Sequence, residues 1–242
     1  MVQLQAMKPT ETVSLAENLE RVRARMQAAQ RRAGRTGEVT LVAVTKTLPG
    51  ERIAEAYRAG VRDFGESRVQ EFEEKCRQLV LPSAVWHLVG HLQSNKARRA
   101  AELFSCIDSL DSLRLAEKLS AAASAAERRL AVLIQVDLGE EATRFGVPPD
   151  ELLTLVEQVA ALEGLSVRGL MTIPPYLEPA ERARPFFRRL RELAEELGRR
   201  QIPGVEMAEL SMGMSHDFEV AIEEGATHVR LGTALFGERP DG

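Results

Sequence analysis

The sequence has few cysteines, few aromatic residues and no long apolar run. Among 242 residues, only Cys76 and Cys106 are cysteines, and aromatic side chains make up 5%. Two distant cysteines exclude a disulfide framework and lack metal-ligand spacing, so we expect free thiols in a reducing compartment. No segment approaches the ~20 apolar residues of a membrane span, and the N-terminus lacks the features of a secretory signal. We therefore expect a cytoplasmic protein without a membrane segment.

An excess of positive charge is also missing. The chain has 32 Lys and Arg against 36 Asp and Glu, a net charge of -4. Nucleic-acid-binding domains carry basic surfaces, so this balance provides no general affinity for polyanions. Lys96, Arg98 and Arg99 make a small basic patch, which we interpret as a solvated helix face. No nucleic-acid partner is expected.

Short apolar strands alternate with amphipathic helical segments from residue 39 onward. Strands are predicted at 39–45, 61–65, 85–89, 104–107, 130–136, 167–172, 207–211 and 227–231, and helices at 51–59, 67–79, 94–102, 111–126, 148–162, 179–198 and 216–224. Eight such strands fit a closed (β/α)8 TIM barrel better than an open sheet. An extra N-terminal helix is predicted over about residues 11–33. We expect a single domain over residues 1–242, with the barrel at about 39–238.

Lys46 ends the first predicted strand, shortly before Pro49 and Gly50 interrupt it. Small and β-branched apolar residues precede the lysine, which is typical of a strand buried on both faces. Functional sites in parallel α/β folds lie at the carboxyl ends of the strands. A buried lysine has a lowered pKa, and its amine can then form a Schiff base. The alternative is a strand-end lysine that only reaches solvent.

Glycines and hydroxyl side chains gather after the seventh and eighth predicted strands, in residues 211–215 and 230–233. Barrels often bind phosphate at these two loops, through backbone amides and hydroxyl groups. Asp217 would repel phosphate, so its side chain is expected to point away. The alternative is that Ser215 only caps the next helix and that the glycines only form turns.

Arg230 ends the eighth predicted strand, where its guanidinium could donate to an aromatic ring nitrogen. An arginine there keeps a pyridine nitrogen unprotonated and weakens the ring as an electron sink. The alternative is an ion pair with Glu66 or another carboxylate. His87 and His91 are four residues apart, but no third ligand with suitable spacing follows, so no metal site is predicted.

Six motifs follow one another along residues 39–238. They are Thr45-Lys46-Thr47, Gly65-Glu66-Ser67-Arg68-Val69-Gln70-Glu71, Trp86-His87-Leu88-Val89-Gly90-His91-Leu92-Gln93-Ser94-Asn95-Lys96, Gly169-Leu170-Met171, Ser211-Met212-Gly213-Met214-Ser215 and Arg230-Leu231-Gly232-Thr233-Ala234-Leu235-Phe236-Gly237. Together they resemble the pyridoxal phosphate homeostasis protein family, the YggS/PROSC-type relatives of the alanine racemase barrel. The resemblance implies a barrel of PLP fold type III that binds pyridoxal 5'-phosphate (PLP) and has no established catalytic activity. It also implies a role in vitamin B6 homeostasis and amino-acid pool balance.

By motif position, the resemblance assigns eight residues to the cofactor. Lys46 would hold PLP as a Schiff base, and Arg230 would face the pyridine nitrogen. Ser215, Gly232 and Thr233 would hold the phosphate. Met214, Ser67 and His87 complete the set. Ser67 stands where the family motif usually has an asparagine, which changes the side chain available for contact.

Two other functions would use the same lysine. A PLP-dependent amino-acid racemase needs a second proton-transfer group, which in racemases comes from an added β domain that this chain is expected to lack. A cofactor-free Schiff-base aldolase would use Lys46 but leave Arg230 without a role. We therefore expect a PLP carrier and not an enzyme. The carrier is expected to be a monomer or weak dimer that contacts PLP-dependent apoenzymes transiently.

Overall fold

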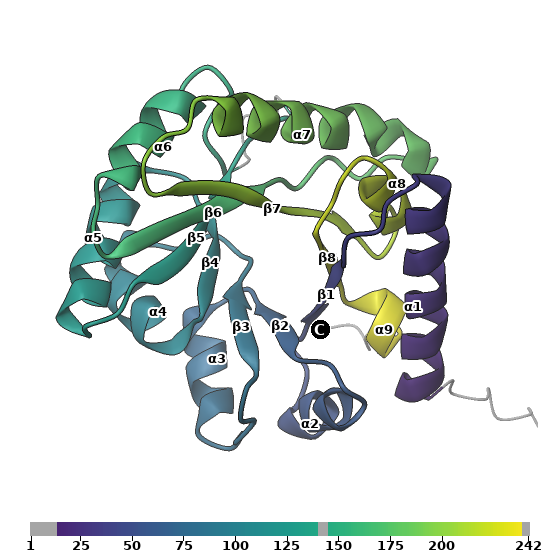
Figure 1. Cartoon of the computed structure of the whole chain (residues 1–242). Coiled ribbons are helices and arrows are strands. Elements are labelled where there is room, and N and C mark those ends of the chain that lie inside the picture. Colours follow the sequence, from purple (N-terminus) through teal and green to yellow (C-terminus); the bar gives the residue numbers. More distant parts are fainter. Residues whose placement is uncertain (1–13, 140–144, 239–242) are drawn as a thin grey trace, which may run out of the picture.

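Eight parallel strands close into a barrel, and helices cover its outer face (Figure 1). The computed structural model describes residues 14–139 and 145–238. Strands β1 to β8 follow one another around the barrel in chain order, and each neighbouring pair is parallel. The (β/α)8 fold predicted from the alternating strands is confirmed.

Most of the strands are short. They are β1 (Thr40–Val44), β2 (Asp63–Glu66), β3 (Val85–Leu88), β4 (Cys106–Leu110), β5 (Leu130–Gln135), β6 (Leu165–Met171), β7 (Val205–Met214) and β8 (His228–Leu231). The helices are α1 (Leu15–Arg32), α2 (Gly50–Arg58), α3 (Val69–Cys76), α4 (Ala97–Leu103), α5 (Leu113–Ala125), α6 (Leu152–Ala160), α7 (Arg184–Arg199), α8 (Phe218–Glu223) and α9 (Thr233–Phe236), with 3-10 turns η1 (Ser94–Lys96) and η2 (Ala180–Ala183). Within the described ranges, every helix is too short or too polar to cross a membrane.

The barrel closes where β8 pairs with β1. Thr40 lies opposite His228, and Ala43 lies opposite Leu231. The first and last strands are therefore neighbours, although almost two hundred residues separate them in the chain (Figure 1). Because parallel strands direct their carboxyl ends to one mouth, the segments after β1, β7 and β8 meet there.

Side chains alternate along each strand between the lumen of the barrel and the layer under the helices. In β5, Val132 and Ile134 belong to the large core between strands and helices. Leu133, between them, instead joins a small separate cluster with Cys106 and Met171. This small cluster lies in the lumen, so the inward positions of the strands carry little apolar volume and leave room for polar side chains.

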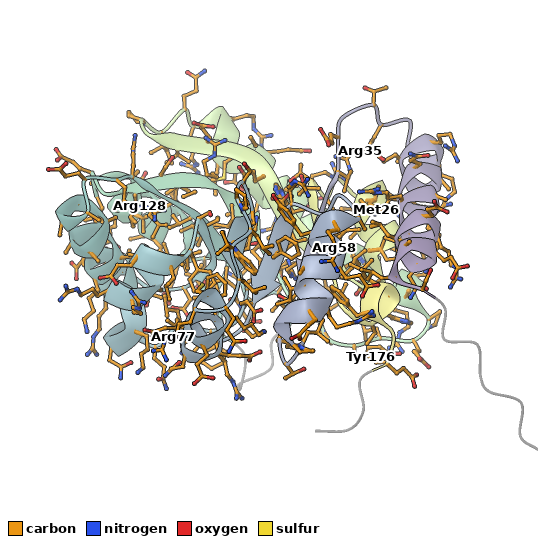
Figure 2. The ribbon with its side chains drawn as sticks, turned by 90° about the horizontal axis from the view of Figure 1, so that it is seen from below. Met26, Arg35, Arg58, Arg77, Arg128 and Tyr176 are labelled. Carbon is orange, nitrogen blue, oxygen red and sulfur yellow. The ribbon has the colours of Figure 1, made fainter. Side chains whose placement is uncertain are left out.

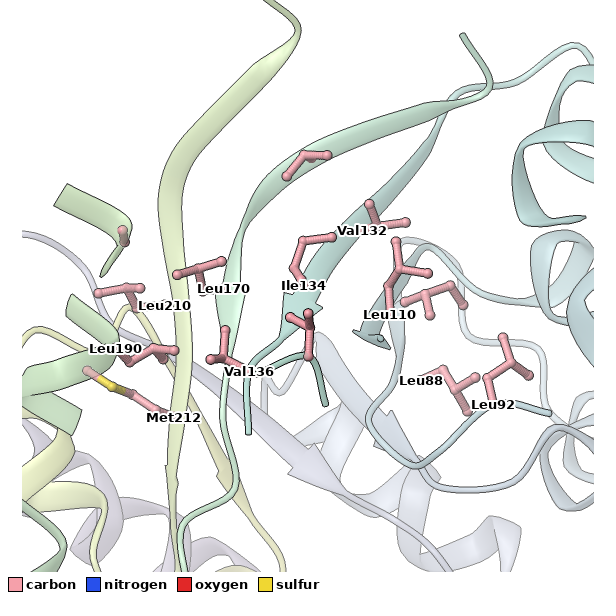
Figure 3. Packing of buried hydrophobic residues seen from close by; sticks show 14 of the residues in the cluster. Leu88, Leu92, Leu110, Val132, Ile134, Val136, Leu170, Leu190, Leu210 and Met212 are labelled. Carbon is pink, nitrogen blue, oxygen red and sulfur yellow. The ribbon is translucent and has the colours of Figure 1, made fainter. Parts of the chain in front are cut away.

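The core between strands and helices holds most of the buried apolar side chains. Figure 3 shows Leu190 of α7 beside Leu210 and Met212 of β7, and residues of β4, β5 and β6 continue the same layer. Leu190 and Met212 are fully buried. Burying one such side chain contributes about 1.5–3 kcal/mol, so this layer fixes each helix to its strands.

Helix α1 precedes the barrel and begins with a capping box. Ser14 Oγ accepts a hydrogen bond from the Glu17 backbone N–H at 3.3 Å, and a Glu17 carboxylate oxygen accepts from the Ser14 backbone N–H at 2.9 Å. Its buried side chains recur at helical spacing and include Met26, on the face toward the barrel (Figure 2). The helix packs on α8 and α9. Residues 11–13 of the predicted helix lie outside the described residues.

Two strands continue well beyond their predicted carboxyl ends. β4 spans Cys106–Leu110 and not 104–107, so Asp108 and Ser109 are fully buried strand residues. β7 continues to Met214 and not only to residue 211. In a sequence, polar residues that follow an apolar run suggest that the strand has ended. In this barrel, polar residues can lie within a strand because the lumen supplies hydrogen-bond partners for them.

Candidate functional site

A cavity of about 400 Å³ opens at the carboxyl ends of the strands. Its lining residues are Val44, Lys46, Ser67, Val89, Ile173, Tyr176, Met214, Ser215, His216, Asp217, Arg230, Gly232 and Thr233. This volume is in the range of small-molecule sites. Seven of the eight candidate cofactor residues surround it: Lys46, Ser67, Met214, Ser215, Arg230, Gly232 and Thr233. The eighth, His87, does not line this cavity.

Lys46 lies two residues beyond the end of β1, and its side chain is exposed. The prediction of a buried strand-end lysine is therefore wrong, because the strand stops at Val44 and the chain turns before the lysine. The preceding Thr45 is fully buried, and its hydroxyl donates a hydrogen bond to a Glu66 carboxylate oxygen at 2.7 Å. The backbone is thus anchored next to a lysine that an aldehyde can reach from solvent.

Glu66 is a buried carboxylate whose cationic partner is Lys75. The Lys75 amine donates to Glu66 at 2.7 Å and to the Thr45 carbonyl at 2.8 Å. Burial raises the pKa of Glu66, although the nearby Lys75 acts in the opposite direction. Glu66 therefore pairs with Lys75 and not with Arg230, the alternative that the sequence left open.

The end of β7 and the turn after β8 meet at Ser215. Its hydroxyl oxygen accepts hydrogen bonds from the backbone N–H groups of Gly232 at 3.3 Å and Ala234 at 3.1 Å. Ser215 does not cap the next helix, because α8 begins after Asp217. Gly213 has φ +91°, and a Cβ there would lie 2.5 Å from the Ala221 Cβ, so this turn requires glycine. The two predicted phosphate segments are therefore joined through one hydroxyl group.

Asp217 lines the cavity, so the expectation that it points away is not met. One of its carboxylate oxygens accepts a hydrogen bond from the Met214 backbone N–H at 2.6 Å. Burial raises its pKa. Its carboxylate is thus engaged with the backbone of its own turn.

Arg230 reaches the cavity from β8 while only 4% of its surface is exposed. Its Nη1 donates to Ser211 Oγ at 2.9 Å, and its Nη2 donates to the Thr172 carbonyl at 2.8 Å. Burial lowers its pKa. A guanidinium has five N–H donors, so these two bonds fix its plane and leave donors for a ligand.

His87 lies in the lumen and lines a hollow of about 500 Å³ at the opposite mouth, where the strands begin. Its Nδ1 is 3.0 Å from Asp108 Oδ1, and its Nε2 is 3.4 Å from Asp63 Oδ1. His91 instead lies 3.3 Å from Asp111. The two histidines of the third motif therefore have separate surroundings and do not form a metal pair.

His87, Cys106 and Asp108 place potential ligand atoms within 4.8 Å of one another, all buried. Both nitrogens of His87 already face carboxylates. Burial raises the pKa of the Cys106 thiol to about 12, with Asp108 acting in the same direction. The cluster is thus a hydrogen-bonded group with a protonated thiol.

Sequence reasoning missed the residues that hold Arg230. Asp108 lies beyond the predicted strand 104–107, and no local pattern connects Ser211 or Thr172 with the arginine. A usable signal exists: Asp108 lies two residues after Cys106 in a short, fully buried strand, so these two side chains share the face toward the lumen. Which side chain it meets depends on strands that are distant in the sequence.

Comparisons with known proteins identify the family. Residues 18–240 match the family model described as alanine racemase, N-terminal domain. A pyridoxal phosphate homeostasis protein of Aquifex aeolicus (strain VF5) is 48% identical over 229 residues, which cover 94% of this chain and 99% of that protein. The chain belongs to the pyridoxal phosphate homeostasis protein family. The members matched in this way are named as homeostasis proteins and not as enzymes.

Two solved structures share the fold of this chain at different levels of sequence identity. PipY of Synechococcus elongatus PCC7942, solved with PLP bound, is 42% identical, with a TM-score of 0.82 over 93% of this chain and 100% of PipY. An alanine racemase of Clostridium difficile 630 is 16% identical, with a TM-score of 0.68 over 92% of this chain and 58% of the racemase. The racemase likeness shows the fold alone. The family barrel is thus the fold type III barrel, as predicted.

Proposed function

We propose that this protein carries PLP as a Schiff base on Lys46 and takes part in vitamin B6 homeostasis and amino-acid pool balance, without catalysis of its own. The observation that carries the proposal is the single cavity shared by Lys46, after β1, and by the segments that end β7 and follow β8. The relative from Aquifex aeolicus and the PLP-bound PipY structure support the choice of cofactor.

The donor groups of the cavity fit a phosphate. The N–H groups of Gly232 and Ala234 donate to the Ser215 hydroxyl oxygen, whose own proton can be donated to a ligand, and the Thr233 hydroxyl lines the same cavity. Backbone N–H groups and hydroxyls at this end of a barrel are suited to phosphate oxygens. In this proposal Ser215, Gly232 and Thr233 hold the phosphate, and Met214 forms the adjoining wall.

PLP supplies an aldehyde that condenses with a primary amine, and a pyridine ring that withdraws electrons. Lys46 provides the amine, and Ser67 contributes a hydroxyl to the same wall. Arg230, fixed by Ser211 and Thr172, donates to the ring nitrogen. A guanidinium keeps that nitrogen unprotonated, which weakens the ring as an electron sink. His87 has no direct contact with PLP in this proposal.

An absorbance spectrum with and without borohydride tests the proposal. The wild-type protein incubated with PLP should absorb in the visible range, and borohydride should fix the cofactor mass to the peptide that contains Lys46. Lys46→Ala should abolish both results. Lys118→Ala, which removes another exposed lysine outside this cavity, should preserve them. A wild-type protein that stays colourless would contradict the proposal, and amino-acid racemisation at enzyme-like rates would support the racemase alternative.

We further propose that the protein works in the cytoplasm as a monomer or weak dimer and contacts PLP-dependent apoenzymes transiently. Lys46 is exposed, and Tyr176, at the same mouth and at the edge of the molecule in Figure 2, is 68% exposed. A partner could therefore approach the bound cofactor. Direct transfer predicts that an apoenzyme gains PLP from the loaded protein even when a trap consumes free PLP.

A further inference from the structure

A chain of side-chain hydrogen bonds runs through the lumen from Arg230 at the cavity to Asp63 at the opposite mouth. Arg230 Nη1 donates to Ser211 Oγ at 2.9 Å, and Ser211 Oγ donates to Asp108 Oδ2 at 3.1 Å. The other oxygen of Asp108 lies 3.0 Å from His87 Nδ1, and His87 Nε2 lies 3.4 Å from Asp63. These five residues, from five different strands, are called the lumen column below.

The lumen column contains opposite charges in alternation. Both ring nitrogens of His87 face carboxylate oxygens, and protonation of both nitrogens, which makes the ring a cation, satisfies both contacts. Burial by itself would lower the pKa of His87, but Asp108 and Asp63 raise it well above its usual value. The order from the cavity is therefore Arg230 positive, Asp108 negative, His87 positive and Asp63 negative.

The other titratable groups at the far mouth do not replace His87 as the cation between Asp108 and Asp63. Burial lowers the pKa of His228, whose ring centre is 6.0 Å from that of His87, so His228 is neutral at neutral pH. Arg168 is paired with Glu209 at 3.1 Å. Cys106 and Arg129 complete the charged or titratable lining of this hollow, and Cys106 keeps its proton.

We infer that His87 and Asp108 are positioning residues for Arg230. They control how the Arg230 guanidinium meets the cofactor ring, and they couple the far mouth of the barrel electrostatically to the cofactor. The inference rests on the proposed function, in which Arg230 contacts PLP. The physical reason is that Asp108 is shared between two cations, one of them held through Ser211. Charges interact strongly in a buried network that water does not screen.

The lumen column predicts opposite effects for two substitutions. His87→Gln keeps a hydrogen-bond donor for Asp108 but removes a positive charge. The nitrogen that joins Lys46 to PLP should therefore keep its proton up to a higher pH. Asp108→Asn removes the negative charge that is nearer to Arg230, so the same proton is lost at lower pH. Each shift should be roughly 0.5–1 pH unit, the size expected when one charge is removed from an interior that water screens little.

A pH titration of the visible absorbance of the PLP-loaded protein measures these shifts. Wild type, His87→Gln and Asp108→Asn are compared with Glu224→Gln, which removes a buried carboxylate outside the lumen column. We expect the midpoints of His87→Gln and Asp108→Asn to move in opposite directions, and the midpoint of Glu224→Gln to stay at the wild-type value. Unchanged midpoints, or displacement of both in the same direction, would overturn the inference, because lost packing alone gives no opposite signs.

Nuclear magnetic resonance of the cofactor-free protein separates this inference from the proposed function. At neutral pH, both ring nitrogens of His87 should be protonated in the wild type, and Asp108→Asn should lower the pH at which the ring loses a proton. A neutral His87 ring in the wild type, or no change in Asp108→Asn, would refute the lumen column. A wild type that stays colourless with PLP but shows the charged ring would refute only the cofactor role.

Discussion

At the scale of single residues, surroundings decide what each candidate side chain can do. Lys46 is exposed at the mouth of the barrel, whereas Arg230 in the same cavity is almost completely buried. The amine is therefore free to react with an aldehyde, and the guanidinium is fixed by Ser211 and Thr172 before any ligand arrives. An exposed nucleophile and a fixed ring contact suit reversible loading of a cofactor.

Gly213→Ala should destabilise the protein by about 2–4 kcal/mol, because the residue has φ +91° and the added Cβ would meet Ala221 of α8. The strain falls on the turn that carries Ser215, so PLP affinity should fall as well. Urea unfolding and a PLP titration measure the two effects. Gly37→Ala is the matched control, because nothing lies within 4 Å of its added Cβ. Wild-type stability of Gly213→Ala would show that the turn can relax.

His87 should make stability depend on pH above neutrality. Its folded pKa is raised, so its contribution is fully present below the unfolded pKa of about 6.5 and is lost as pH rises through the folded pKa. Urea midpoints between about pH 6 and pH 9 should therefore decline more in the wild type than in His87→Gln. Parallel curves for the two proteins would mean that His87 is not charged in the folded state.

At the scale of secondary structure elements, α7 is joined to the end of α8 by a group of arginines around one carboxylate. Arg184, Arg188 and Arg191 lie 3.0, 3.0 and 3.3 Å from Glu224, which is 7% exposed. Burial would raise the pKa of Glu224, but Arg188, Arg184 and Arg191 lower it to about 2. These ion pairs attach α8, the helix before β8, to α7, the helix before β7.

Glu224→Gln should lower stability at neutral pH by roughly 2 kcal/mol, after allowance for the partial exposure of the arginines. The folded pKa is depressed, so the contribution of Glu224 is present above its unfolded pKa of 4.5 and disappears as pH falls toward 2. Thermal unfolding from pH 7 to pH 3 should show the two proteins converging in acid. A constant difference across that range would contradict an ionic role.

At the scale of the whole molecule, the cavity joins the first strand to the last two. β1 supplies the segment with Lys46, and β7 and β8 supply Ser215 and Thr233. β1 and β8 are hydrogen-bonded neighbours, so the cavity lies across the pair of strands that closes the barrel. A ligand that contacts all three segments should therefore stabilise barrel closure itself.

Saturation with PLP at 100 times its Kd should stabilise the folded protein by about 2.7 kcal/mol if the cofactor binds only the folded state. Thermal unfolding followed by circular dichroism, with and without PLP, measures this effect. Lys46→Ala should lose most of the gain because the covalent link is absent. A PLP-independent melting temperature in the wild type would contradict a cofactor that bridges the closing strands.

The sequence was sufficient for much of the fold and for the composition of the cavity. Apolar periodicity located the eight strands, and the expected barrel closure places Lys46 with Ser215 and Thr233. It failed at β4, where Asp108 and Ser109 appeared to end a strand that in fact continues through them. It also failed for the burial of Lys46, because a local pattern does not show where a strand leaves the sheet.

The sequence by itself determined the order of strands and helices and the chemical groups at the strand ends, because both follow from local periodicity and residue type. Only the tertiary structure decided which of those groups meet. The link from Arg230 through Ser211 and Asp108 to His87 joins residues up to 143 positions apart, on four strands. Closure of the barrel places these inward side chains in one lumen, and no local pattern contains that proximity.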